Sequence, residues 1–388
     1  MRGSRALRTV EPYPFESLDR AKARALREGR ELIDFGVGDP RGETPAFIRR
    51  ALVEALEPVS SYPRAAGLPE LRDAIAGWVG RRFGVDLDPS TDLFPILGSK
   101  EIVFSLAQAV VEPADGRDLV AVTTPGYPIP ERGARWVGAD VLRLPLREES
   151  DFLPDLDAVD DETWRRLALV WINYPNNPTG AVAPAAFYDR LAGLAREHGF
   201  LLASDEAYSE VYFEGSPPGS ALQVGDLTNV LVVNTLSKRS SMTGYRSGFV
   251  AGDRELIAGL KALRPSTGVT PQEFVQRASV AAWGDEAHVE EARASYAEKR
   301  AVFLELFRER GVEVAGSVAS FYLWVKVPGG EASADFAMRL LERGVVVAPG
   351  SFFGPEGEGF MRMAMVPALE ACRRAADLLA ASLEEVRA

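Results

Sequence analysis

The chain is poor in cysteine and histidine, which limits the chemistry it can carry out. Cys372 is its one cysteine, so no internal disulfide can form and a reducing compartment, the cytoplasm, is expected. The two histidines lie far apart, His198 before a glycine at an expected helix end and His288 in a charged helical stretch. We expect both imidazoles to be solvated, and we therefore expect no histidine-based metal site.

Blocks of basic charge and long hydrophobic runs are also missing. The formal net charge is −12 and no basic block rises above the acidic background, which argues against a nucleic-acid or anionic-membrane partner. No stretch approaches the ~20 apolar residues of a membrane-spanning helix, and the basic start MRGSRALRTV is not followed by an apolar segment. We therefore expect no signal peptide and a soluble globular protein, with length enough for two structural units.

Short apolar segments alternate with helix-like segments between Gly98 and Gly252. The apolar segments are residues 118–122, 168–172, 200–204, 230–234 and 248–252. Because they are apolar on both faces, they indicate a mainly parallel sheet covered by helices, an α/β fold. Polar residues follow these strands directly, at the edge where open α/β sheets bind ligands.

Beyond Pro271 the pattern changes to a smaller α+β unit. It contains a charged helix over 286–310, a strand-like FYLWVKV, a helix over 333–343 and a last helix from Ala368. The N-terminal helix, residues 17–28, is expected to join this unit. We divide the chain into an N-terminal arm with part of the small domain (1–39), a large domain (40–270) and a small C-terminal domain (271–388).

Lysine is scarce, and one lysine stands in a distinctive place. The chain has six, and Lys238 lies where an apolar strand breaks into the polar loop TLSKRSSMTGYRSG, eight residues before Arg246. A lysine amine there can form a Schiff base with pyridoxal phosphate, while nearby hydroxyls and the arginine hold the phosphate. An ordinary surface lysine is the alternative for Lys238 taken alone.

Further motifs along the chain converge on the same cofactor. The segments IDFGVGDP, ILGSKEIVF, TPGYP, INYPNNPTG, SDEAYSEVY, LSKRSSMTGYRSG and FMRMAMV occur in this order. From about Asp34 to Val366 the chain resembles the fold-type I aminotransferases, the aspartate aminotransferase superfamily. The resemblance implies a large domain with a mainly parallel sheet, a smaller α+β domain, pyridoxal 5'-phosphate, amino-acid and 2-oxo-acid substrates, and a homodimer with shared active sites.

The resemblance implies a phosphate site built from backbone, hydroxyl and guanidinium groups. Its members here are Gly98, Ser99, Lys100, Thr235, Ser237 and Arg246. The first three follow a strand and open a helix, so their N–H groups can point at an anion. Thr235 stands where the family usually has a serine. The alternatives are a plain turn with Ser99 as N-cap and a surface ion pair for Arg246.

The resemblance also assigns residues around the cofactor ring. Asp205 follows an apolar strand, where a carboxylate is costly without a positive partner, and it would pair with the pyridine nitrogen. Asn177 and Tyr208 would bond the phenolic oxygen, and Tyr127 would stack on the ring. The alternatives are a helix N-cap for Asp205, a plain turn for NNPTG and a core aromatic for Tyr127.

Other residues resemble the family's substrate and subunit contacts. Arg362, in FMRMAMV, matches the arginine that pairs with the substrate α-carboxylate, and the backbone of Gly38 and the amide of Asn177 lie at the same subsite. Tyr62 resembles the tyrosine that reaches the cofactor of the neighbouring subunit, which requires at least a dimer. Freed from the Schiff base, Lys238 would act as the general base.

Within the superfamily, KRSS, YRSGFVAGD and the PYPF segment resemble the N-succinyl-LL-diaminopimelate aminotransferases of lysine biosynthesis. Both of their substrates carry a distal carboxylate, so we expect a second cation opposite Arg362. Arg239 and Arg64 are the candidates, with a surface ion pair as the alternative for each.

Aminotransferases of the aspartate, alanine or LL-diaminopimelate type and a same-fold lyase also remain possible. Arg362 argues against a decarboxylase, and no GxGxxG after a strand supports a dehydrogenase.

Overall fold

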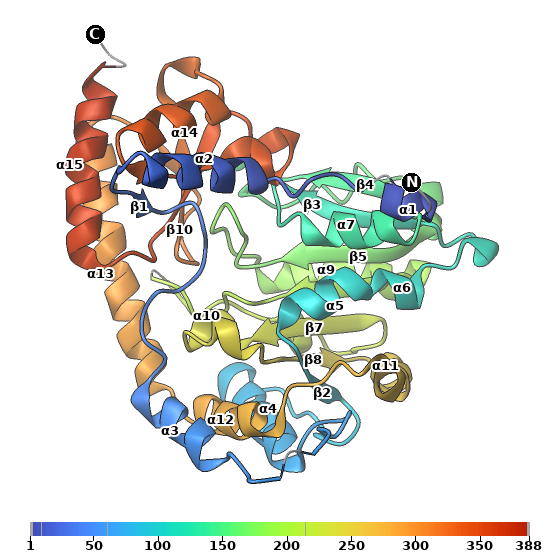
Figure 1. Ribbon diagram of the computed structural model, residues 1–388. Helices are drawn as coiled ribbons and strands as arrows, with labels where there is room; N and C mark the ends of the chain where they lie inside the picture. The colour runs from blue at the N-terminus through green and yellow to red at the C-terminus, as the bar shows by residue number, and fades with distance from the viewer. Residues whose placement is uncertain (1–2, 9, 60, 214, 386–388) are drawn as a thin grey trace.

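The computed structural model describes residues 3–8, 10–59, 61–213 and 215–385 (Figure 1). Within them, a seven-stranded sheet lies in the middle of the chain. Its strands, in spatial order, are β2 (Leu93–Ile96), β8 (Gly248–Gly252), β7 (Val230–Thr235), β6 (Leu201–Asp205), β5 (Leu167–Asn173), β3 (Leu119–Thr124) and β4 (Asp140–Pro145). Every residue of β3, β5, β6, β7 and β8 is buried, as the continuous apolar segments predicted.

The strands from β7 to β4 run parallel, which confirms the predicted mainly parallel sheet. The exception is β8, which pairs antiparallel with both β7 and β2. Only the short helix α10 (Leu236–Arg239) and one further turn separate β7 from β8. This connection is too short for the crossover that a parallel neighbour needs, so the chain reverses direction instead.

Helices cover both faces of this sheet. One face packs against α4 (Pro69–Phe83), α9 (Ala185–His198) and α12 (Glu273–Trp283), and the other against α5 (Ser99–Ser105), α7 (Ile129–Trp136) and α11 (Arg254–Thr267). Alternate strand residues serve the two faces: Val230 and Val232 join the first core, Leu231 and Val233 the second. The remaining helices of this part are α1 (Arg5–Arg8), α3 (Ala46–Glu54), α6 (Ala107–Val110) and α8 (Asp161–Arg166).

The C-terminal elements build a second core. Within the described residues, β12 (Ala348–Pro349), β13 (Phe360–Ala364), β10 (Tyr322–Lys326) and β9 (Val314–Ala315) form an antiparallel sheet. Around it lie α13 (Ala287–Glu309), α14 (Ser333–Glu342) and α15 (Leu369–Glu385). No helix of the described chain is both long and apolar enough to cross a membrane.

The N-terminal segment packs on this second core rather than beside its sequence neighbours. Helix α2 (Glu16–Arg27) places Leu18 and Ala21 against Leu341 and Val346. Strand β1 (Ile33–Asp34) pairs in parallel with β11 (Val345–Val346). Figure 1 shows the blue α2 lying alongside the orange-red α14, so the N-terminal helix and the C-terminal part of the chain share one core.

Candidate active site

A pocket of about 410 Å³ lies beyond the carboxyl ends of β5, β6 and β7, which end at Asn173, Asp205 and Thr235. The sheet forms its floor, and residues of the second core close it from the other side. Most of the residues expected at the site line it: Gly38, Ser99, Lys100, Tyr127, Asn177, Asp205, Tyr208, Thr235, Ser237, Lys238, Arg246 and Arg362.

Lys238 is placed by the short helix α10. Thr235 caps this helix by accepting a hydrogen bond from the backbone N–H of Ser237 at 3.2 Å. The Lys238 Nζ reaches across the pocket and donates to the carbonyl of Gly38 at 2.5 Å. Burial lowers the pKa of the lysine amine to about 8, and Arg362 and Arg246 act in the same direction. The amine therefore loses its proton more readily than a surface lysine, as a nucleophile requires.

Asp205 is a buried carboxylate at the end of β6. It is 7% exposed and accepts one backbone N–H, from Ala207 at 3.2 Å. Burial raises the pKa of this carboxyl group to about 6. A turn follows rather than a helix, so the N-cap alternative is wrong. The carboxylate is suited to a cationic ligand group such as a pyridinium N–H.

Arg246 and the start of α5 form a basic hollow. Arg246 adopts a left-handed φ of 55° and donates to the carbonyls of Thr243 at 2.8 Å and Leu97 at 3.1 Å. Gly98, with φ 71°, lies so close that a Cβ there would stand 2.5 Å from Arg246 Nη2. Gly98 is also the N-cap of α5, so the alternative with Ser99 as N-cap is wrong. The hollow offers N–H and guanidinium donors to an anion.

The Arg362 guanidinium is buried and incompletely bonded. It is 3% exposed, and it donates to Asn177 Oδ1 at 2.8 Å and to the carbonyl of Gly36 at 2.7 Å, while its Nε has no partner among the described residues. Its carbon lies 4.2 Å from the centre of the Tyr322 ring and 4.6 Å from that of Phe353. A rigid, buried arginine with a free donor suits a carboxylate.

Aromatic side chains complete the pocket. The hydroxyls of Tyr208 and Tyr322 lie 2.9 Å apart, and burial raises the pKa of the Tyr208 phenol, which therefore keeps its proton. Tyr127 is half-buried and lines the pocket, although it also packs against the sheet core. A Cβ on Gly38 would lie 1.9 Å from the Tyr322 hydroxyl oxygen, so any larger residue here would have to displace the Tyr322 side chain.

Several lining residues were missed from the sequence. They are Tyr13, Phe15, Asp19, Val37, Asp39, Asn173, Ala207, Thr243, Tyr322 and Phe353. Tyr13 and Phe15 belong to the PYPF segment, which served as a subfamily signature and did not predict that its residues line the pocket. No local motif marked Tyr322 or Phe353 as a pocket residue, because the sequence around each looks like that of an ordinary hydrophobic core.

The structure does not bring every expected residue to this pocket. Tyr62 is 99% exposed, and Arg64 is also exposed. Arg239 is 2% exposed and donates to Ala282 O and to Glu286, so the prediction that it reads a distal carboxylate is wrong. Consecutive residues of a helix point about 100° apart, and Arg239 therefore faces away from the side occupied by Lys238.

The prediction of a solvated imidazole is wrong for His288. His288 is 7% exposed and lies 2.8 Å from the Ser240 hydroxyl, because the junction before α13 folds onto α10. His198 is half-buried and stacks on Trp164, with ring centres 6.1 Å apart.

Comparison with known proteins agrees with this geometry. The chain belongs to the class I and II aminotransferases, whose family model matches residues 30–379. It is therefore a pyridoxal-phosphate-dependent aminotransferase of fold type I, and the residues around the pocket fit that cofactor.

Individual relatives are similar over almost the whole chain. An LL-diaminopimelate aminotransferase of Nitratidesulfovibrio vulgaris is 41% identical over 366 residues, 92% of this chain and 93% of the relative. One from Aquifex aeolicus is 40% identical and covers 96% of both chains. Among solved structures, substrate-bound BacF of Bacillus subtilis has a TM-score of 0.92 at 32% identity, covering 98% of both chains. A probable N-succinyldiaminopimelate aminotransferase of Thermus thermophilus has a TM-score of 0.87 at 34% identity, covering 95% of this chain and all of that one.

Proposed function

We propose that this aminotransferase takes LL-diaminopimelate as amino donor and 2-oxoglutarate as acceptor. The observation that carries the proposal is the charge of the outer pocket, by which we mean the part of the pocket that would hold the distal end of the donor. Asp19 and Asp39 line the pocket, while the expected second arginine, Arg239, instead donates to Ala282 O outside it. LL-diaminopimelate ends in an ammonium and a carboxylate, whereas the N-succinyl derivative replaces that ammonium with a further acidic arm. The relatives at 40–41% identity that carry the name LL-diaminopimelate aminotransferase support this choice.

The distal end of the donor would meet charges of both signs. The Asp39 carboxylate makes no hydrogen bond or salt bridge with another described residue, although its charge, acting against burial, raises the pKa of Lys238, and it can accept an ammonium. Lys100 forms no ion pair within the described chain, and its Nζ lies 5.5 Å from the Tyr13 ring centre at the same pocket. Its ammonium is therefore available for the distal carboxylate.

In the proposed division of labour, each inner residue has one task. Bound pyridoxal phosphate supplies the electron sink for the reaction. The hydroxyls of Thr235 and Ser237, the backbone at 98–100 and Arg246 would hold its phosphate, and Asp205 would hold its ring charge. Arg362 would bind the α-carboxylate, which places the substrate Cα–H toward Lys238. The Lys238 amine would then take that proton and deliver it to the cofactor carbon two atoms away, on the far side of the substrate nitrogen, with no other base required.

N-succinyl-LL-diaminopimelate remains the second candidate. The Thermus structure and the KRSS and YRSGFVAGD segments favour it. The two donors differ only at their distal end, so the same inner pocket serves both and the outer charges must discriminate between them.

A panel of amino donors with 2-oxoglutarate, ranked by kcat/KM, tests the substrate. LL-diaminopimelate should exceed N-succinyl-LL-diaminopimelate, aspartate and alanine. In Asp39→Asn, the ratio of LL-diaminopimelate to N-succinyl-LL-diaminopimelate should fall by about tenfold, because the ammonium loses its partner while effects common to both donors cancel. Tenfold preference for the succinylated donor in the unmodified enzyme would assign the second candidate instead.

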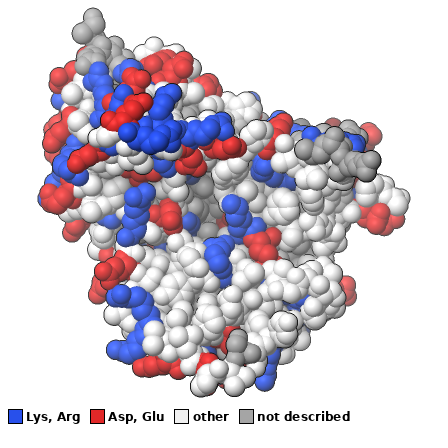
Figure 2. Space-filling model, viewed as in Figure 1, with Lys and Arg blue, Asp and Glu red and all other residues white. Residues whose placement is uncertain are grey.

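We also propose that the protein is a homodimer whose partner completes each site. Tyr62 is fully exposed, and Val53, Leu56 and Val59 are 64%, 54% and 78% exposed on the same part of the chain. Figure 2 shows a largely uncharged surface below its middle, where α3, α4 and α12 lie. Exposed apolar side chains grouped in this way are typical of an interface. Tyr62 would then contact the partner's cofactor rather than its own.

Subunit mixing tests the shared site. Lys238→Ala and Tyr62→Phe subunits should regain activity when mixed, because one site of each heterodimer then holds both native residues. Sedimentation should give twice the chain mass. A monomer, or mixing without any gain, would contradict the proposal.

A further inference from the structure

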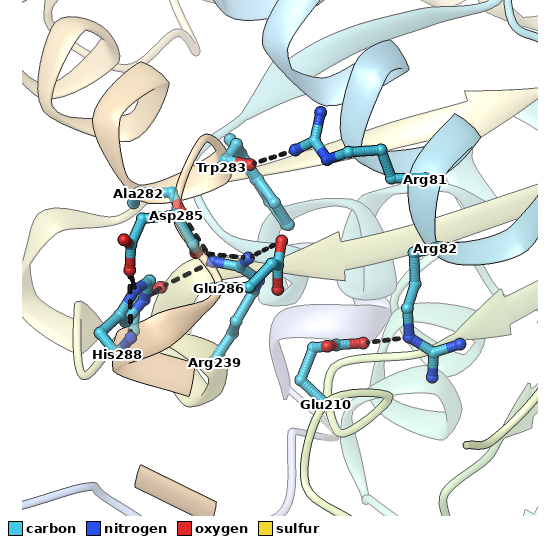
Figure 3. A network of polar contacts seen from close by, with 10 residues as sticks. Arg81, Arg82, Glu210, Arg239, Ala282, Trp283, Asp285, Glu286 and His288 are labelled. Carbon is cyan, nitrogen blue, oxygen red and sulfur yellow. Dashed lines mark hydrogen bonds and ion pairs between the residues drawn. The ribbon is translucent and has the colours of Figure 1, made fainter. Parts of the chain in front are cut away.

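The two residues that follow Lys238, Arg239 and Ser240, do not line the cofactor pocket but enter a buried polar network. Figure 3 shows Arg239 in this network with Ala282, Asp285, Glu286 and His288. Arg239 Nη1 donates to Ala282 O at 2.7 Å, and its Nη2 donates to Asp285 O at 3.0 Å and pairs with Glu286 at 2.7 Å. The guanidinium lies 5.1 Å from the centre of the Trp283 ring. Arg239 thus binds the carboxyl end of α12, where the helix dipole favours a cation.

Ser240 continues the network toward α13. Its Oγ lies 2.8 Å from His288 Nε2, and His288 Nδ1 lies 2.6 Å from Asp285 Oδ1. The same Asp285 oxygen accepts the backbone N–H of His288, in the first turn of α13, at 3.1 Å. The network therefore joins α10 to both helices of the α12–α13 junction.

The donors and acceptors in this network are consistent with a neutral His288 imidazole. Burial lowers the pKa of His288, and Arg239 acts in the same direction while Asp285 opposes it. With one proton, Nδ1–H donates to the Asp285 carboxylate and Nε2 accepts from the Ser240 hydroxyl. Arg239 Nη1 lies 3.3 Å from the Ser240 oxygen, which accepts from it. Each hydrogen bond in the series from Arg239 through Ser240 and His288 to Asp285 then has one donor and one acceptor.

This constellation resembles a nucleophile–histidine–carboxylate triad, but its burial assigns it another role. Ser240 and Arg239 border a second cavity, of about 560 Å³, but each is only 2% exposed, so little of the serine is accessible to a substrate carbonyl. The network contacts α10, the four-residue helix that contains Lys238. It also touches the start of α13, whose Phe303 and Phe307 belong to the second core.

We propose that Arg239, Ser240 and His288 are positioning residues for Lys238. They clamp the end of α10 to the α12–α13 junction, which keeps the lysine amine at its reacting position near Gly38 O. A displacement of about 1 Å at a reacting group costs on the order of 10²-fold in rate, so a small shift of this four-residue helix has a large effect. The proposal rests on the aminotransferase chemistry and is independent of the identity of the donor.

Ser240→Ala in the holoenzyme is the most direct test, because it removes one hydroxyl and leaves the volume nearly unchanged. With the donor that ranks first in the panel, kcat should fall by about tenfold while KM changes less than about threefold. The pH midpoint of the visible absorption change of the bound cofactor, measured without substrate, should move by about 0.5 unit or more.

His288→Leu and His288→Gln form a matched pair. The leucine removes the acceptor and should reproduce the Ser240→Ala effects, while the glutamine Oε1 can accept from Ser240 and should restore most of kcat and the absorption midpoint. Arg117→Lys is the control, because Arg117 also bonds two backbone carbonyls, at 2.8 and 2.6 Å, but at the opposite edge of the sheet.

The control separates positioning from stability. Ser240→Ala and Arg117→Lys are both expected to lower the melting temperature, and only Ser240→Ala should move kcat and the absorption midpoint. If Ser240→Ala and His288→Leu left both readouts at their native values while lowering the melting temperature, the network would be purely structural and the proposal overturned. Equal losses in His288→Gln and His288→Leu would overturn the assigned acceptor role.

Discussion

The two edges of the seven-stranded sheet treat polar groups in opposite ways. At the amino-terminal edge, Arg166 pairs with Asp118 at 3.0 Å and Asp140 at 3.1 Å, and Arg117 donates to the carbonyls of Leu167 in β5 and of His198 at the end of α9. At the carboxyl edge, Asp205 accepts a single backbone N–H, and Arg362, which lines the same pocket from β13 of the four-stranded sheet, has an Nε with no partner among the described residues. Groups at the first edge satisfy one another and support the fold, whereas those at the second need a ligand.

The pKa values express the same contrast. Burial raises the pKa of Asp205 to about 6 and lowers that of Lys238 to about 8, so each group is held where its charge is disfavoured. The partners of Arg166, in contrast, raise the pKa of that arginine. Such perturbed groups are typical of active sites, and they cost stability until the ligand arrives.

The largest expected effect of a substitution at the carboxyl edge is that of Lys238→Ala. Transamination should fall by at least about 10⁴-fold, since both the covalent anchor and the base are lost. After borohydride reduction of the native holoenzyme, peptide mapping should place the cofactor on Lys238. A label on Lys100 or Lys261 would refute the assignment of the pocket.

Asp205→Asn should come next, with kcat lowered on the order of 10²–10⁴-fold and cofactor affinity lowered much less. The amide can still hydrogen-bond but carries no charge to balance a protonated ring nitrogen. Steady-state kinetics with saturating cofactor measures this split. A loss of only a few-fold would make Asp205 a structural residue.

The smallest effect, and the sharpest test of the comparison, is on the stability of the cofactor-free protein. Asp205→Asn should stabilise it by about 2–3 kcal/mol at pH 7, because the native carboxylate is ionised there at a cost. The pKa of Asp205 in the folded protein lies above the ordinary value, so the free-energy cost of ionising it appears as pH rises from about 4 to 6. The stabilisation by Asp205→Asn should therefore vanish near pH 4. Arg117→Met, at the other edge, should destabilise by about 1–3 kcal/mol because it leaves two carbonyls unbonded.

Denaturant unfolding of both variants at pH 4 and pH 7 measures these shifts. Stabilisation by Asp205→Asn of equal size at both pH values would show that the gain comes from something other than the buried charge. Destabilisation by both variants at pH 7 would remove the contrast between the two edges.

Much of the inner site could be predicted from the sequence because its residues are carried by local motifs. Thr235, Ser237 and Lys238 lie on one strand–helix turn, and Asp205 and Asn177 follow apolar strands whose ends meet at one edge. The continuous apolar runs likewise predicted the buried strands. Their order along the chain placed these residues in one pocket before any contact was known.

The outer site could not be predicted in this way. Arg239 adjoins Lys238 in sequence, yet its side chain goes to the α12–α13 junction. His288 looked solvated in a charged helix, yet it is buried by a contact with Ser240, far away in sequence. For both residues, a distant segment decides the direction and surroundings of the side chain.

The sequence by itself determined which strands are buried, where each strand ends, and which chemical groups stand at those ends, because burial and turn formation depend on neighbouring residues. The tertiary structure alone decided that β8 runs antiparallel and that Arg362 meets Asn177 and Gly36, whereas the packing of the N-terminal helix on the small unit was already expected from the sequence. Those pairings join segments that are far apart in the chain. They follow from the packing of whole elements, in which each side chain takes the direction that the completed core and its remaining hydrogen-bond partners allow.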